Sequence, residues 1–125
     1  MLHNILVTLS LLVAATSANG KDAAGGFECK YDGNQQEMNA CAVRDFKAAD
    51  AILNERYKAL MSALPRAKQP MLQQQQRGWL KRRDPTCKAK AEQSEGGSIW
   101  PLEYFGCLQS ATERRTKELE RWRIE

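Results

Sequence analysis

Four cysteines in a chain of 125 residues constrain the fold more than any other feature of the sequence. An even number of cysteines in a small secreted chain predicts a covalent framework, because such a chain has little hydrophobic core to depend on. No two of them have the C-x-x-C spacing of zinc knuckles or thioredoxin-like redox sites. We therefore expect two structural disulfides, formed in an oxidising compartment, among Cys29, Cys41, Cys87 and Cys107.

The expected pairing is Cys29 with Cys41 and Cys87 with Cys107. Each of these pairs brackets one local element, whereas crossed pairings would force the N-terminal end onto a distant junction between helices. In the chain-entropy model each bridge would contribute about 3 kcal/mol to the free energy of unfolding.

The first residues are typical of a cleavable export signal. An apolar stretch over residues 5–15 is followed by small residues that a signal peptidase accepts. The stretch is too short to span a bilayer, which favours a cleaved signal. No Lys or Arg precedes it, which is unusual for such a signal, and a retained anchor is the alternative. We expect a signal peptide at residues 1–18, a flexible leader at 19–26 and a helical domain at 27–125. The protein would be periplasmic or secreted, without a lipid anchor or stable membrane insertion.

Histidine chemistry is excluded once the signal is removed. His3 is the only histidine in the chain. Ser-His-Asp and Cys-His catalysis need an imidazole, and most catalytic zinc sites need one as a ligand. Asp and Glu are scattered among Lys and Arg at helical spacing, which is typical of solvated helix faces. We therefore expect no enzymatic activity, no metal site and no cofactor.

Apolar residues recur at steps of three and four in the first half of the chain, which indicates a helix with one buried face. We expect Asn39 to cap this helix and Pro65 to end it. Pro70 suits the first turn of a second helix, which Pro85 should kink or stop. The apolar positions of the first helix are Ala42, Phe46, Ala49, Leu53, Tyr57, Leu60 and Leu64.

A glycine-containing segment divides the second helix from a third. Residues 95–101 hold two glycines and a proline and are expected to be a loop. A third helix is expected over about residues 102–122, and no stretch favours a strand. The sequence predicts an all-α fold: a small bundle of three, or alternatively four, helices stapled by two disulfides.

The net charge of +4 hides a basic middle. Residues 56–90 hold ten Lys or Arg and a single acid, whereas residues 21–55 and 91–125 are net acidic. One interpretation is that the helices neutralise one another when they pack. The other is a patch that binds anionic glycans, phosphorylated lipids or acidic proteins of the cell envelope. Nucleic acid is not expected as a partner in that compartment.

Short motifs that occur in a fixed order along the chain make it similar to a known protein family. Together with the four cysteines they are Glu37-Met38-Asn39-Ala40-Cys41-Ala42, Ala49-Asp50, Leu53-Asn54, Tyr57, Trp79, Arg83-Asp84, Gly96-Gly97-Ser98, Cys107-Leu108, Thr112, Arg115 and Leu119. In this order the chain closely resembles the LprI-type lysozyme inhibitor family. The sequence departs from the family pattern at Pro85 and lacks a lipid-anchor cysteine before the domain. The resemblance implies a small exported helical protein, some of whose relatives bind and inhibit lysozyme.

The resemblance implies inhibition of lysozyme-like muramidases by steric occlusion, without catalysis. A lysozyme cleft holds two catalytic carboxylates and sugar subsites, so an inserted loop carrying a hydroxyl or a cation would block it. The alternative is a non-inhibitory stress or structural protein that binds anionic cell-wall or lipid components through its basic patch.

The candidate partner-binding residues lie in two segments. Trp79 is interpreted as a core residue. Trp100 could instead cover the second disulfide, and Arg83 could instead form an ion pair with Asp84. Common lysozymes are strongly basic, so most of their surface should repel the basic segment. Binding would then use the acidic ends or the cleft itself. The candidates are Ser98, Ile99 and Trp100 on the loop and Lys81, Arg82 and Arg83 on the second helix.

Overall fold

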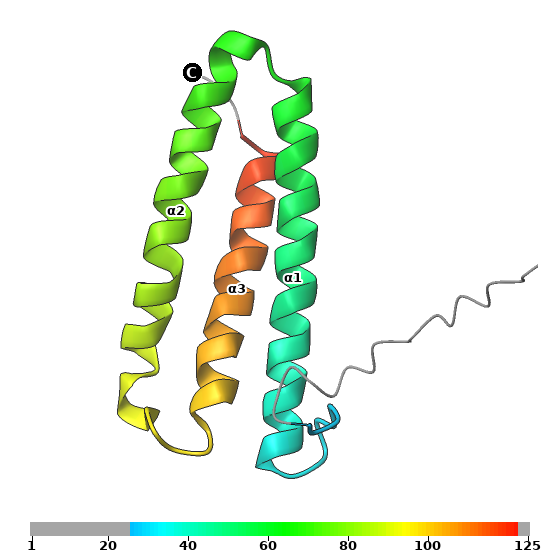
Figure 1. Ribbon diagram of the computed structural model, residues 1–125, viewed down its shortest axis with the longest axis vertical. Coiled ribbons are helices and arrows are strands. Elements are labelled where there is room, and N and C mark those ends of the chain that lie inside the picture. Colours follow the sequence, from blue (N-terminus) through cyan, green and yellow to red (C-terminus); the bar gives the residue numbers. More distant parts are fainter. Residues whose placement is uncertain (1–25, 123–125) are drawn as a thin grey trace, which may run out of the picture.

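Three long helices form an up-down-up bundle in the computed structural model, which describes residues 26–122 (Figure 1). These residues contain no strand, so the all-α prediction is confirmed, and they form three α-helices, not four. The expected signal peptide lies outside the described residues. The elements are α1 (Gln35–Ala63), η2 (Arg66–Lys68), α2 (Gln69–Lys90), η3 (Glu92–Ser94) and α3 (Trp100–Glu120), of which η2 and η3 are short 3₁₀ helices.

Helix α1 begins earlier than the sequence prediction. Asn34 is the N-cap: its side-chain oxygen accepts a hydrogen bond from Glu37 N at 2.9 Å, and Glu37 Oε1 accepts one from Asn34 N at 3.2 Å. This reciprocal capping box satisfies two backbone donors that a helix start leaves free. The expectation that Asn39 caps the helix is therefore wrong. The expected end is confirmed, because Leu64 is extended before Pro65.

Helix α2 continues through Pro85, which was expected to kink or stop it. Pro70 lies in the first turn as predicted, but the helix continues past Pro85 to Lys90. Proline removes one backbone hydrogen bond, yet the turn after it holds Cys87, which is buried and joined to α3 by a disulfide. Tertiary packing thus maintains the last turn against the local preference.

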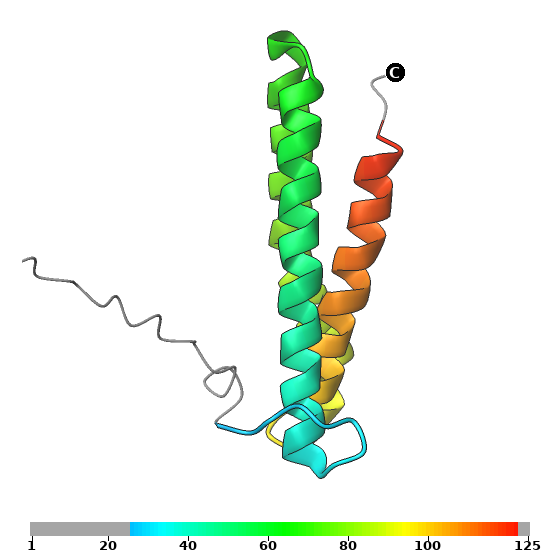
Figure 2. The ribbon, with the colours of Figure 1, turned by 90° about the vertical axis from the view of Figure 1, so that its right-hand side faces the viewer.

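The apolar core lies toward the α1–α2 connection, and each helix contributes one leucine to it. Leu53, Leu72 and Leu119 are almost completely buried. The expected apolar face of α1 is confirmed, since its residues are buried or partly buried. Packed against the leucines are Tyr57, Leu60, Met61, Leu64, Trp79 and Trp122. Figure 2 shows α3 lying beside the α1–α2 pair.

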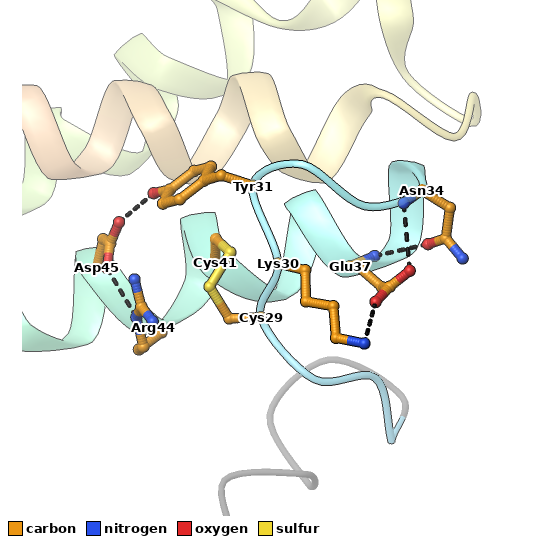
Figure 3. Close-up of a disulfide and its surroundings, with 8 residues drawn as sticks. All are labelled: Cys29, Lys30, Tyr31, Asn34, Glu37, Cys41, Arg44 and Asp45. Carbon is orange, nitrogen blue, oxygen red and sulfur yellow. Dashed lines mark hydrogen bonds and ion pairs between the residues drawn. A yellow bond between two sulfur atoms is a disulfide. The ribbon is translucent and has the colours of Figure 1, made fainter.

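Both disulfides lie at the opposite end of the bundle. The expected pairing is confirmed: Cys29 is bonded to Cys41, with a Cα–Cα distance of 4.4 Å, and Cys87 to Cys107, with 5.5 Å. The first bridge holds the segment before α1 against the second turn of that helix (Figure 3). The second joins the end of α2 to the start of α3.

Candidate functional site

Arg83 is a structural centre of the bundle and not an exposed cation. Its side chain is only 10% exposed. Nη1 lies 2.9 Å from Asp50 Oδ1 on α1, and Nε lies 2.9 Å from Asp84 Oδ1 on α2. Nη1 also donates to Thr112 Oγ1 on α3 at 3.4 Å. One guanidinium therefore links all three helices, and the pairing with Asp84 that the sequence suggested is confirmed.

Two aromatic rings lie near the Arg83 guanidinium. The Arg83 guanidinium carbon lies 5.1 Å from the Phe46 ring centre and 5.4 Å from that of Trp79. The guanidinium carbon of Arg115 lies 5.9 Å from the centre of the Trp79 ring, and Arg115 Nε donates to Gln76 Oε1 at 2.9 Å. These cation–π contacts add to packing in the partly desolvated interior. Trp79 packs against the leucine core, in agreement with its interpretation as a core residue.

Trp100 is the first residue of α3 and not the tip of a loop. Its ring stacks on Tyr104 with the ring centres 4.6 Å apart. The expected loop over residues 95–101 is thus too long, because Pro101 is well suited to a first helical turn. Within the described residues, Trp100 Nε1 is buried without a hydrogen-bond partner. The last residue before α3 is Ile99, whose apolar side chain is 42% exposed.

The remaining loop, residues 95–99, is held firmly at its base while its own residues are exposed. Asn39 Nδ2 on α1 donates to the Ser98 carbonyl oxygen at 2.8 Å. The Ser94 hydroxyl bonds to Glu103 and to the Ala91 carbonyl oxygen, which fixes η3 to α3. Gly96 has φ of +83°, a left-handed conformation that glycine adopts without strain. We name residues 95–99 the end loop.

The structure does not bring the two groups of sequence candidates together. Ser98 and Ile99 lie on the end loop, whereas Lys81 and Arg82 are exposed on α2. Within residues 26–122, no hydrogen bond, ion pair or ring contact joins Lys81 or Arg82 to the end loop. Arg82 instead borders a hollow between α2 and α3. The end loop and the exposed α2 cations are therefore separate surface features.

A second hollow, of about 420 Å³, lies between α1 and α3 and was missed in the sequence. Its apolar lining includes Ala48, Ala49 and Ile52. The two adjacent alanines were the feature of the sequence that could have indicated a hollow, because their side chains are small. The carboxylates at its border are mostly neutralised. Asp45 is bonded to Tyr31 and Arg44 (Figure 3), and Glu120 lies 3.4 Å from Arg56. This hollow therefore has little net charge with which to select a partner.

The hydrogen bond from Tyr31 to Asp45 shifts the pKa of both side chains. The phenolic hydroxyl donates to Asp45 Oδ2, and this hydrogen bond lowers the pKa of the carboxyl group. The same bond raises the pKa of Tyr31. The pair connects the segment before α1 to the helix about three turns from its start (Figure 3). It supplements the nearby disulfide with a polar link.

Within residues 26–122, no helix is long and apolar enough to cross a membrane. In the same range, His, Cys, Asp and Glu side chains do not gather in groups of three or more that could hold a metal ion.

The fold and the end loop define a small, disulfide-stapled helical protein that presents an exposed loop at one end. The family model described as lysozyme inhibitor LprI matches residues 28–119, and the chain belongs to this family. The resemblance seen in the sequence is thereby confirmed. The family is one of inhibitors and not of catalysts, and is typically extracytoplasmic.

A curated relative is similar over almost its entire length. Uncharacterized protein R02472 of Rhizobium meliloti (strain 1021) is 32% identical over 126 residues, which cover 90% of this chain and 89% of that protein. No solved structure matches the chain.

Proposed function

We propose that this protein is an exported inhibitor of lysozyme-like muramidases that blocks the catalytic cleft without taking part in catalysis. Membership of the LprI family over residues 28–119 is the observation that carries the proposal. The export signal expected at residues 1–18 supports action in the periplasm or outside the cell.

The end loop is the proposed inhibitory element. Its backbone is narrow at Gly96 and Gly97, so it can approach a partner closely. The Ser98 hydroxyl can donate to a catalytic carboxylate of the enzyme, and the exposed Ile99 side chain can enter a sugar subsite. Because the base of the loop is already ordered, binding costs little conformational entropy.

Charge also favours this end of the molecule for a basic partner. Glu92, Glu95 and Glu103 lie in or beside the end loop, and all three are exposed. Lys81 and Arg82, which would repel a basic enzyme, lie farther along α2, and the cation that borders a hollow with Glu103 is Lys90. A carboxylate-bearing loop is therefore electrostatically complementary to a lysozyme surface that the basic segment would repel.

The test is a cell-wall lysis assay with lysozyme and increasing amounts of the purified protein. Loss of lysis that saturates near one molecule of protein per enzyme is expected, because occlusion needs a stoichiometric complex. Unaffected lysis, combined with salt-sensitive sedimentation of the protein on isolated envelopes, would contradict inhibition and support the alternative of an envelope-binding protein.

A further inference from the structure

Cations without partners gather around the hollow between α2 and α3. Its volume is about 210 Å³, and Cys87, Cys107 and Trp79 form part of its lining. The second disulfide fixes the two helices to each other at this point. No carboxylate lines the hollow. The polar and charged groups of its walls include Arg82, Thr86 and Lys90 from α2 and Arg114 from α3.

These cations differ from the arginines that stabilise the bundle. Arg83 and Arg115 are 10% and 11% exposed, and each forms an ion pair. Arg82, Lys90 and Arg114 are exposed and form no ion pair or hydrogen bond within the described residues. Ion pairs therefore neutralise Arg83, through Asp50 and Asp84, and Arg115, through Glu118, but leave Arg82, Lys90 and Arg114 without a carboxylate partner within the described residues. Three unpaired cations around one concavity create a positive potential there.

Another hollow lies next to this one along α2. Arg82 borders both, and the second is also lined by Gln74, Gln75 and Gly78. A Cβ atom at Gly78 would lie 3.2 Å from Arg82 Nη1, so the absence of a side chain gives the guanidinium room to lie along the helix. The residues of α2 that line the two hollows extend from Met71 to Lys90, which at 1.5 Å per residue is about 30 Å, and we name this strip of surface the α2–α3 track.

We propose that this α2–α3 track binds an extended anionic polymer, namely a glycan that carries phosphate, sulfate or carboxylate groups. Cations on both walls of a concave track suit a single strand lying between them. Thr86 and the Gln74 amide add neutral hydrogen-bond donors along the track. A flat membrane surface would instead meet the outward face of α2, where helical spacing places Arg77, Lys81 and Lys88.

This binding is separate from lysozyme inhibition. The track runs along the side of the bundle, whereas the end loop lies beyond the end of α2. An anionic envelope glycan held in the track would keep the protein at the cell wall, where muramidases act. Loss of one activity would therefore leave the other intact.

The test compares two triple variants that remove the same charge. The track variant carries Arg82→Gln, Lys90→Gln and Arg114→Gln, and the control variant carries Arg77→Gln, Lys81→Gln and Lys88→Gln. Each purified protein is titrated with a heparin oligosaccharide, as a sulfated glycan probe, at low and at physiological salt. Circular dichroism confirms that both variants are folded.

We expect the track variant to bind heparin at least about tenfold more weakly than the wild type, and the control variant to change less than about threefold. Affinity should fall as salt rises, because counterions compete for the same cations. Equal losses in both variants would overturn the proposal, since net charge alone would then explain binding. Absence of heparin binding at low salt would overturn it as well.

A parallel titration with vesicles of phosphatidylglycerol and phosphatidylcholine separates a glycan from a membrane. Weaker binding to vesicles than to heparin is expected. Tighter binding to vesicles that the control variant abolishes would overturn the proposal, because the ligand surface would then be the outward face of α2. Lysozyme inhibition, measured in the same preparations, should be unchanged in the track variant.

Discussion

Arg83 does more for the bundle than its neighbours in the basic run Lys81-Arg82-Arg83. Its contacts reach Asp50, Asp84 and Thr112, and two aromatic rings cover its guanidinium. A planar guanidinium can make these contacts together, whereas a lysine ammonium cannot. Residues of one charge type in one run thus have quite different roles.

Replacing Arg83 should destabilise the protein. Arg83→Ala leaves Asp50 partly buried without its partner, and we expect a loss of about 2–3 kcal/mol in the free energy of unfolding. Arg83→Lys should recover less than half of that loss. Urea unfolding followed by circular dichroism measures the change, and the exposed neighbour Arg82→Ala, expected to change stability by less than about 0.5 kcal/mol, is the control. Equal effects at the two positions would contradict the central role of Arg83.

A change at Ile99 should affect binding to lysozyme without affecting the stability of the fold. Ile99→Ser is expected to weaken lysozyme inhibition by roughly thirtyfold, or about 2 kcal/mol, with little change in the thermal transition. Leu80→Ser is the matched control, since Leu80 is 43% exposed, against 42% for Ile99, but lies on α2. If Leu80→Ser weakens inhibition as much, or Ile99→Ser not at all, the end loop is not the contact surface.

Trp100→Ala is expected to lower stability instead, because the ring stacks on Tyr104 within α3. The loss of this stack and of its partial burial should cost roughly 1–2 kcal/mol in the free energy of unfolding. Differential scanning calorimetry measures it. An unchanged transition with weaker inhibition would show that Trp100 contacts the enzyme directly.

At the scale of elements, the end loop depends on a helix that is distant in sequence. Asn39 Nδ2 on α1 bonds to the Ser98 carbonyl oxygen across 59 positions of the chain. Asn39→Ala should cost about 1 kcal/mol in stability and weaken inhibition severalfold, because the loop must then be ordered during binding. Faster hydrogen exchange at residues 95–99 is the expected signature. The control is Gln36→Ala, because Gln36 lies one turn from Asn39 on α1 and its side chain is exposed. This change should alter neither stability nor inhibition.

The segment before α1 should respond to acid. Hydrogen bonding from Tyr31 lowers the pKa of Asp45, so this pair stabilises the folded state above the ordinary carboxyl pKa of about 4 and loses that effect as pH falls further. We expect Tyr31→Phe to reduce stability at pH 6, and the difference from the wild type to shrink toward pH 2. Urea midpoints at several pH values test this. A difference that is the same at pH 6 and pH 2 would contradict the assignment.

At the scale of the whole molecule, the sequence predicted the architecture well because periodicity and cysteine spacing are local signals. Three helices and both disulfides are confirmed. The errors occurred where two local signals compete or where packing overrides one. Asn34 and Asn39 are both plausible caps, and only Asn34 has an acid three positions later. Pro85 is tolerated because a disulfide and a buried side chain hold the following turn.

The candidate site was less predictable for a different reason. Motif residues that carry the family resemblance, such as Asp50, Trp79, Arg83, Thr112 and Arg115, lie in the interior contacts that join the helices. They therefore predict the shared fold and say little about the surface that meets a partner. The basic middle of the chain shows the same limit, since packing places Arg83 in the interior, Arg82 and Lys90 on the α2–α3 track, and Arg77, Lys81 and Lys88 on the outward face of α2.

The position of the two disulfides at one end has a consequence for where the protein can work. The leucine cluster lies at the other end, so we expect reduction to loosen the end loop and to leave a folded remainder. In dithiothreitol we expect most of the helical signal to persist while inhibition is lost. Complete unfolding, or full inhibition after reduction, would contradict this expectation. If inhibition is lost on reduction as expected, the protein inhibits its target in an oxidising compartment and is inactive in a reducing one.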